Sequence, residues 1–503
     1  MSDDEACAPP DPTNVVDDIT VEYDALLASV TRRCASTGQS HLLDHVSDVP
    51  YHERLALLKS IDGMPLELLS SYLRGALDEE ARLKNPSGGG GGGGGGGDVI
   101  EPFVGESIST MTSDPHQLDV LEKSRKVGMD AVAGGSVAAI LLAGGQGTRL
   151  GYDGPKGMYD IGLSSGRTLF ALMAERIRKL GILSGGHSKS IPLYVMTSPL
   201  NHDATSTYFR TNDDFGIDVR FFPQGTLPAL TFDGEMILET RTSISVAPDG
   251  NGGIYPALVR HGILEDMKER GIKYMHVFGV DNALVKPADP TFVGYCILRD
   301  ADCGNKVLWK ANPDEKVGVV AYRNGKPCIV EYSDMSKEMC ERRDDDGRLT
   351  FGAGNICNHF YTLDFVEDVI VPNLGSMYHV ARKKIPYYDV DSGMTVIPPS
   401  NNGIKLESFI FDVFPLSTNM AVLDVKREAE FAPVKNPPGS ESDSPDTARR
   451  LFSDVAKGWM RDAGAILVGD LESDLCEVGP LTSYDGEGLE SWMGKEVMCP
   501  FSI

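Results

Sequence analysis

Three stretches near the N-terminus carry apolar residues at the spacing of an amphipathic helix. In 24–31, 53–61 and 66–77, leucine, valine and isoleucine return every three or four positions. Ten consecutive glycines follow at 88–97, a composition typical of a flexible tether because glycine restricts the backbone least. We therefore expect an N-terminal helical region over 1–134 that contains this polyglycine tether.

A different pattern begins after Gly135, where short apolar runs alternate with amphipathic stretches. The runs predict buried strands at 137–143, 191–197, 219–222 and 274–280. The clearest helix is 168–180, with its apolar residues on one face and Gly181 as its expected stop. Apolar strands separated by helices are typical of an α/β domain with a mainly parallel sheet covered on both faces. Ligands of such sheets bind beyond the carboxyl ends of the strands.

The composition changes again at 436–450, where the polar segment NPPGSESDSPDTARR predicts a linker or surface loop. Roughly fifty residues follow it, too few for a large independent domain. We expect a central α/β domain over 135–430 and a small C-terminal domain over 431–503.

Charge and cysteine content limit the class of protein. The 503 residues contain 47 Lys and Arg against 73 Asp and Glu, a net charge of −26 that repels nucleic-acid backbones. No apolar run approaches the about 18 residues of a membrane span. The nine cysteines form no C-x-x-C pair, and the acidic N-terminus does not resemble a secretory signal. We expect a cytoplasmic protein with reduced thiols that binds neither nucleic acid nor membrane.

The strongest chemical signal is the segment LLAGGQGTRLGYDGPKG, which begins in the first predicted strand. Gly144, Gly145 and Gly147 follow that strand directly, and glycines there let the backbone approach a ligand and present N–H groups to phosphate oxygens. Arg149 and Lys156 add positive charge in the same segment. The segment matches neither the Walker loop nor the dinucleotide fingerprint. It predicts a polyphosphate-binding loop of another kind.

Gly-Gly-x-Gly-Thr-Arg followed by Pro-Lys-Gly resembles the signature of the nucleotide-sugar pyrophosphorylases. The longer context is similar to the eukaryotic-type UDP-N-acetylglucosamine (UDP-N-acetylhexosamine) pyrophosphorylases. The matching segments are LLAGGQGTRLG, PKGMYDIGL, FFPQGTLPAL, SVAPDGNGGIYPAL, VFGVDNALVKPADP, EYSDMS, GAGNICNHF, NGIKLESFIFDVF, REAEFAPVKN and SYDGEGLES. This resemblance implies a Rossmann-like, GT-A-like nucleotidyltransferase domain with a mixed, mainly parallel sheet, between N-terminal helices and a small C-terminal domain.

The resemblance also implies which residues bind the substrates. It makes Arg149 and Lys156 the catalytic residues, and it makes Asp281 the contact for Mg²⁺ (or Mn²⁺) and phosphate. The implied substrate-binding residues are Leu142, Ala143, Gly144, Gly145, Gly147, Gln224, Gly250, Asn251, Gly318, Glu331, Tyr332, Asn355, Phe409, Phe411 and Lys435. Gln224 would read the uracil edge with its amide, although Pro223 stands where the family has Gln.

Several of these residues have another reading from the sequence alone. Asp281 could cap a turn, and the Asp-Gly-Asn-Gly-Gly run that holds Gly250 could be a turn and no more. Phe409 and Phe411 are typical of a core strand, and Lys435 is typical of a surface lysine. Only the resemblance gives these residues a role in binding.

The reaction that the resemblance implies is UTP + N-acetylglucosamine 1-phosphate ⇌ UDP-N-acetylglucosamine + pyrophosphate, by in-line attack on the α-phosphorus. The attacking phosphate is already an anion, so alignment and charge neutralisation suffice. Alternatives are a broad UDP-sugar pyrophosphorylase, an N-acetylgalactosamine-preferring enzyme, and a catalytically silent nucleotide-sugar sensor. Whether the protein is a monomer or a homodimer stays open.

Overall fold

The computed structural model describes residues 12–84, 98–103, 107–187 and 190–503, so the predicted tether at 88–97 lies outside them. Contacts divide the chain into two compact units. Unit 1 comprises Met1–Asn85, Thr226–Gly250 and Gly375–Phe409, and unit 2 comprises Pro86–Gly225, Asn251–Leu374 and Ile410–Ile503. This division differs from the three consecutive domains expected at 1–134, 135–430 and 431–503, because each unit is assembled from segments that are distant in sequence.

Unit 1 contains the three predicted N-terminal helices. They are α1 (Pro12–Thr37), α2 (Tyr51–Asp62) and α3 (Leu66–Lys84), which confirms the helical periodicity of this region. Leu58 and Ile61 of α2 are fully buried in one cluster with Leu230 and Ile404 from the middle of the chain. The helices therefore complete their core with segments of the predicted central domain, and this burial explains why unit 1 is discontinuous.

The strands of unit 1 form small sheets. The three-stranded sheet has the order β16 (His379–Lys383), β19 (Gly403–Glu407), β7 (Leu230–Thr231). The paired strands are β6 (Thr226–Pro228) with β10 (Val246–Pro248), β8 (Leu238–Thr240) with β9 (Ser243–Ile244), and β17 (Tyr387–Asp389) with β18 (Met394–Val396).

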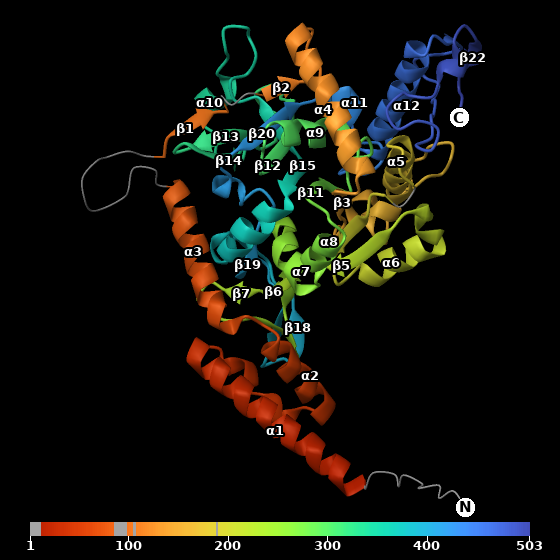
Figure 1. Cartoon of the computed structure of the whole chain (residues 1–503). Coiled ribbons are helices and arrows are strands. Elements are labelled where there is room, and N and C mark those ends of the chain that lie inside the picture. The colour runs from red at the N-terminus through yellow and green to blue at the C-terminus, as the bar shows by residue number, and fades with distance from the viewer. Residues whose placement is uncertain (1–11, 85–97, 104–106, 188–189) are drawn as a thin grey trace, which may run out of the picture. The chain divides into compact units, whose positions relative to one another are not determined.

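Unit 2 is built on a large mixed sheet, and Figure 1 labels most of its strands. Its main path runs β2 (Ser107–Ser109), β20 (Met420–Asp424), β12 (Cys303–Trp309), β15 (Ala353–Thr362), β11 (Tyr274–Gly279), β3 (Val137–Leu142), β4 (Leu193–Thr197), β5 (Val219–Pro223). Beside it lie β1 (Ile100–Pro102), β13 (Val319–Arg323) and β14 (Lys326–Val330). Along the main path only β15 runs antiparallel to its neighbours. The predicted α/β class with a mainly parallel sheet is confirmed.

The described helices of unit 2 are α4 (Pro115–Ala133), α5 (Leu169–Leu183), α6 (His202–Thr211), α7 (Ile254–Arg260), α8 (Ile263–Glu269), α9 (Pro290–Leu298), α10 (Lys337–Glu341), α11 (Arg427–Glu430) and α12 (Pro445–Asp462). A two-stranded parallel sheet of β21 (Ile466–Val468) and β22 (Glu496–Met498) follows α12. None of the helices in the described part of the chain has the length and apolarity that a membrane span requires.

Two expectations about helix ends are wrong. Gly181 does not stop α5 but lies buried inside it, where a Cβ would come 2.7 Å from the His187 carbonyl oxygen. The predicted linker 436–450 is helical from Pro445 onward. Ser444 caps this helix, and a Ser-Pro pair that is typical of a loop also suits an N-cap followed by the first helical position.

The register of the central strands positions the loops at the carboxyl edge of the sheet. β3 and β11 pair in parallel with Leu142 opposite Gly279. On the other side of β3, the parallel strands β4 and β5 end together, with Thr197 opposite Pro223. The loops that follow these strands therefore begin at one edge, as the rule for open α/β sheets predicts.

Helices α4 and α9 pack backbone against backbone through two glycines. A Cβ on Gly128 would lie 1.8 Å from the Pro290 carbonyl oxygen, and a Cβ on Gly294 would lie 1.8 Å from the Ser124 carbonyl oxygen. Neither neighbour can move without moving its helix. Only glycine fits these two positions.

We expect Gly128→Ala to lower the free energy of unfolding by about 3 kcal/mol, because the added methyl group separates α4 from α9. Urea denaturation measures this change. The matched control is Gly458→Ala in α12, where nothing lies within 4 Å of the new Cβ. That variant should be more stable by up to about 1 kcal/mol, since alanine favours a helix. Equal stability of the two variants would contradict the packing argument.

Candidate active site

The glycine-rich loop after β3 is closed by backbone hydrogen bonds. The Gly147 N–H donates to the Gly154 carbonyl (2.8 Å), and the Lys156 N–H donates to the Gly145 carbonyl (3.1 Å). Gly147 has no room for a side chain, because a Cβ would come 2.7 Å from the Tyr152 ring. Nothing lies within 4 Å of a Cβ on Gly145. The loop is thus fixed in shape and open at Gly145, where a ligand can approach the backbone.

Asn201, which follows β4, holds the start of this loop. Its buried amide nitrogen donates to the carbonyls of Ala143 (2.9 Å) and Gly145 (3.4 Å), and its oxygen accepts from the Ser198 N–H (2.8 Å). The sequence does not reveal this role of Asn201, because a single Asn after a strand carries no signal of its partner 58 residues away.

Gln224 comes from the end of β5 to the same loop. Its backbone N–H donates to the Thr197 carbonyl (2.8 Å), and its side chain is largely buried. A Cβ on Gly144 would lie 2.4 Å from the Gln224 Oε1 atom, so glycine at 144 makes space for this amide. The structure brings together Gln224 and the loop, although Pro223 replaces the residue that the family has there.

Four charged side chains gather beside the loop. Lys156 faces Asp281, Lys435 and Arg149, and the Lys435 Nζ lies 3.7 Å from the Asp281 Oδ2. Burial lowers the pKa of Lys156, the two neighbouring cations lower it further, and Asp281 acts in the opposite direction. Three cations against one carboxylate give a positive site within an acidic protein, which suits a polyphosphate.

Lys435 reaches this cluster because Asn282 anchors the segment before it. The Asn282 side chain donates to the Glu430 carbonyl (2.7 Å) and accepts from the Ala432 N–H (2.9 Å). The Val434 N–H then donates to the Asp281 carbonyl (2.8 Å). Lys435 is exposed, as a surface lysine would be, but the anchored segment places it beside Asp281. The role of Asn282, like that of Asn201, cannot be read from the sequence, because its partners lie about 150 residues away.

Leu142 and Ala143 join the loop to the sheet. The Leu142 carbonyl accepts from the Val280 N–H (3.2 Å), and the Ala143 N–H donates to the Met196 carbonyl (2.8 Å). Both side chains are buried. Their contribution to the site is to place the loop between the ends of β4 and β11.

A divalent cation would have Asp281 as its protein ligand. The described residues contain no group of three or more His, Cys, Asp or Glu side chains that could hold a metal ion. Mg²⁺ does not need such a group, because it commonly takes one or two carboxylates and fills its shell with water and phosphate oxygens. A single carboxylate beside three cations fits that mode.

The predicted sugar-binding residues of β15 and its neighbours form a second group. The Asn355 N–H donates to the Gly318 carbonyl (2.8 Å), and a Cβ on Gly318 would lie 3.0 Å from Glu331 Oε1. The Asn355 Oδ1 accepts from the Cys357 N–H (3.1 Å). Burial, then Asp281, raises the pKa of Cys357 to about 12. Because Cys357 interacts with Asp281 and Lys435, this second group lies close to the charged cluster. The raised pKa keeps Cys357 in its neutral form, which makes it an unreactive thiol.

Three other predicted substrate-binding residues, Gly250, Asn251 and Tyr332, lie outside these two groups. Gly250 has a positive φ of 89°, and a Cβ there would lie 2.2 Å from the Ser408 carbonyl oxygen. Both the turn conformation and the close approach of Ser408 therefore require glycine at this position. The Asn251 Oδ1 accepts from the Ile410 N–H (3.0 Å). Gly250 belongs to unit 1 and Asn251 to unit 2. Tyr332 is exposed.

Phe409 and Phe411 lie in an irregular segment after β19 and not in a core strand. Both are half-buried. Within unit 1 the Phe409 ring lies 4.9 Å from the His379 ring, and within unit 2 the Phe411 ring lies 6.5 Å from the Phe414 ring. The core-strand reading of this segment is wrong, because the strand ends at Glu407.

Comparison with known proteins gives a consistent result. A model of the family described as UTP–glucose-1-phosphate uridylyltransferase matches residues 106–444. UDP-N-acetylhexosamine pyrophosphorylase-like protein 1 of Xenopus tropicalis is 42% identical over 494 residues, with 93% of this chain and 94% of that protein covered. UDP-N-acetylglucosamine pyrophosphorylase of Saccharomyces cerevisiae is 43% identical over 378 residues, with 74% and 78% covered.

A solved structure extends the likeness to the fold. The crystal structure of uridine diphosphate N-acetylglucosamine pyrophosphorylase from Trypanosoma brucei, in complex with an inhibitor, has a TM-score of 0.79 to this chain. The two sequences are 30% identical, and the match covers 93% of this chain and 94% of that one.

The lowered pKa of Lys156 predicts how anion binding depends on pH. A lysine is positive only below its pKa, so Lys156 loses its charge at a lower pH than an ordinary lysine. We expect pyrophosphate binding to weaken by roughly tenfold between about pH 7 and about pH 10, as measured by titration calorimetry. Lys156→Arg is the control, because arginine stays charged and the variant still reports the titration of pyrophosphate itself. The same pH dependence in both proteins would rule out Lys156 as its source.

Proposed function

The chain belongs to the UTP–glucose-1-phosphate uridylyltransferase family, and we propose that it makes UDP-N-acetylglucosamine and pyrophosphate from UTP and N-acetylglucosamine 1-phosphate. The observation that carries the proposal is the cluster of Arg149, Lys156 and Lys435 around Asp281 at the glycine-rich loop. The choice of sugar rests on relatives named UDP-N-acetylglucosamine pyrophosphorylase or diphosphorylase, which are 39 to 43% identical.

The chemistry needs little beyond alignment and charge neutralisation. A phosphate oxygen of the sugar 1-phosphate forms a bond to the α-phosphorus of UTP, and the bond from that phosphorus to the bridging oxygen of the β-phosphate breaks. The electron pair leaves with pyrophosphate, and no proton has to move. Lys156 and Arg149 would hold the departing pyrophosphate, and Lys435 would reach the nucleotide phosphates from the C-terminal region. Gly144 and Gly145 let the nucleotide lie against the backbone.

Asp281 would hold Mg²⁺ (or Mn²⁺) together with phosphate oxygens of the nucleotide. Such an ion, when bound, neutralises phosphate charge and orients the triphosphate. Gln224 would pair with the uracil edge, since an amide offers both a donor and an acceptor. Glu331 and Asn355 would meet the sugar hydroxyls, and the half-buried Phe411 would offer an apolar surface to the N-acetyl methyl group.

The proposed partners of the protein are the two substrates and the two products, with no nucleic acid and no membrane among them. The proposal holds equally for a monomer and for a homodimer. We place the protein in the cytoplasm, a location that the eight free cysteines of the described residues support.

The first test compares three sugar 1-phosphates as partners of UTP and Mg²⁺. Pyrophosphate release by the purified protein should be fast with N-acetylglucosamine 1-phosphate and slow with glucose 1-phosphate. Faster turnover of N-acetylgalactosamine 1-phosphate would indicate that the preferred amino sugar is the other one. Equal turnover of glucose 1-phosphate would indicate a broad UDP-sugar pyrophosphorylase. No turnover, with retained UDP-N-acetylglucosamine binding, would indicate a nucleotide-sugar sensor.

The second test removes the central cation. Lys156→Ala should lower kcat by about a hundredfold, because the charge that develops on the leaving pyrophosphate loses a cation that neutralises it. The control is Lys273→Ala, an exposed lysine just before β11 at the opposite edge of the sheet. This control should keep normal turnover, and both variants should unfold at the wild-type temperature. Normal kcat in Lys156→Ala would refute the role assigned to Lys156.

A further inference from the structure

Unit 2 buries a charged network that the proposed reaction does not use. Lys306, in the middle of β12, has a side chain with no exposed surface. Its Nζ lies 2.5 Å from Asp289 Oδ2 and 2.5 Å from Glu430 Oε2. A buried lysine is costly unless carboxylates surround it, so these two contacts fix the positions of both carboxylates.

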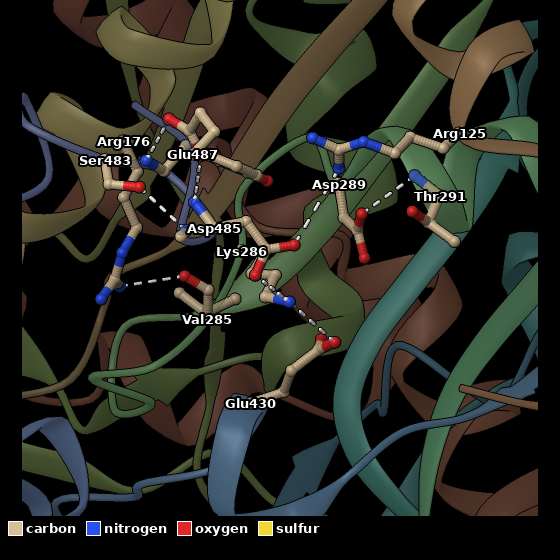
Figure 2. A network of polar contacts seen from close by, with 12 residues as sticks. Arg125, Arg176, Val285, Lys286, Asp289, Thr291, Glu430, Ser483, Asp485 and Glu487 are labelled. Atoms are coloured by element: carbon tan, nitrogen blue, oxygen red, sulfur yellow. Dashed lines mark hydrogen bonds and ion pairs between the residues drawn. The ribbon is translucent and has the colours of Figure 1, made fainter. Parts of the chain in front are cut away.

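Figure 2 shows that Glu430 also faces a second lysine. Its Oε1 lies 3.4 Å from Lys286 Nζ, and the same nitrogen lies 2.8 Å from Asp485 Oδ1. Burial alone would lower the pKa of Lys286, but Glu430 and Asp485 raise it above its usual value. Each oxygen of the Glu430 carboxylate thus contacts a different lysine, which holds the side chain at two points.

Glu430 is also the last residue of α11, and the phosphate-binding Lys435 follows five residues later. The Glu430 carbonyl accepts the Asn282 side-chain N–H, and Asn282 directly follows Asp281. From there the backbone runs beside the end of β11, with the Ala283 N–H donating to the Ala432 carbonyl (3.0 Å). The segment that carries Lys435 is therefore fixed at its start by the two lysines and along its length by Asn282.

We propose that Glu430 is a positioning residue that sets the place of Lys435 relative to Asp281. Its carboxylate is held by Lys306 and Lys286, and its carbonyl is held by Asn282. Lys435 itself is half-exposed, so the side chain alone does not define its position. This inference rests on the proposed function, in which Lys435 faces the nucleotide phosphates.

The test replaces Glu430 by glutamine and uses Asp289→Asn as its matched control. Either change removes one negative charge from Lys306 and leaves that lysine with one carboxylate partner. Glu430→Gln also leaves Lys286 with Asp485 alone, whereas Asp289→Asn keeps both carboxylate partners of Lys286. Asparagine can still cap α9, as Asp289 does through the Thr291 N–H. Asp289 is the N-cap of α9 and does not belong to the segment 430–435 that carries Lys435, so the control separates loss of stability from loss of position.

We expect Glu430→Gln to lower kcat by roughly tenfold with KM for UTP within about twofold, because a displaced cation acts mainly on the transition state. Asp289→Asn should keep kcat within about twofold of wild type at a similar loss of melting temperature. An equal loss of kcat in both variants would overturn the proposal, since it would show a general effect of the network.

A double-mutant cycle decides whether Glu430 acts through Lys435. In a Lys435→Ala background, Glu430→Gln should have little further effect, because the residue that it positions is gone. Additive losses would overturn the proposal.

The same cycle can be read from the equilibrium binding of pyrophosphate, which requires no turnover and reports the charge that the displaced cation would neutralise. If the wild-type protein releases no pyrophosphate with any sugar phosphate, the proposed function fails while the binding cycle still tests Glu430. If the wild type is active and the cycle is additive in both measurements, only the inference about Glu430 fails.

Discussion

The parallel pairing of β3 with β11 is the constraint on which the site depends. With Leu142 opposite Gly279, the glycine-rich loop and Asp281 must leave the sheet side by side. A shift of one residue would turn the side chains of either strand to the opposite face of the sheet, and both strands are almost fully buried. The apolar contacts of the core therefore fix the register, and the register fixes which polar residues meet.

A site for polyphosphate has to hold cations together before the ligand arrives. Arg149, Lys156 and Lys435 repel one another, and burial adds to the cost for Lys156, which its lowered pKa expresses. Backbone hydrogen bonds at Gly145 and Gly147 hold the loop against this repulsion, so the alignment is built before binding. A bound polyanion then gains the attraction without first ordering the loop.

Buried charge also serves the site indirectly. Lys306 and Lys286 lie among three carboxylates, an arrangement that adds little stability over an apolar core because desolvation offsets the attraction. Such a network nevertheless restricts where its side chains can lie, since a buried charge is destabilised when it moves away from its partner. Glu430 belongs to this network through its side chain and, through its backbone, to the segment that carries Lys435.

The sequence by itself determined the features that local patterns encode. Apolar spacing predicted the N-terminal helices and the central strands, and glycines next to Arg149 and Lys156 indicated a phosphate loop. The spacing of apolar residues indicates which face of a helix or strand is buried, but it does not indicate which segment packs against that face. Contacts between segments far apart in the chain determine the roles of Asn201, Asn282 and Glu430. The same is true of the irregular segment that holds Phe409 and Phe411, and of the discontinuous unit 1. Only the tertiary structure decides these contacts, because hydrogen bonds and ion pairs form between positions that no local pattern relates.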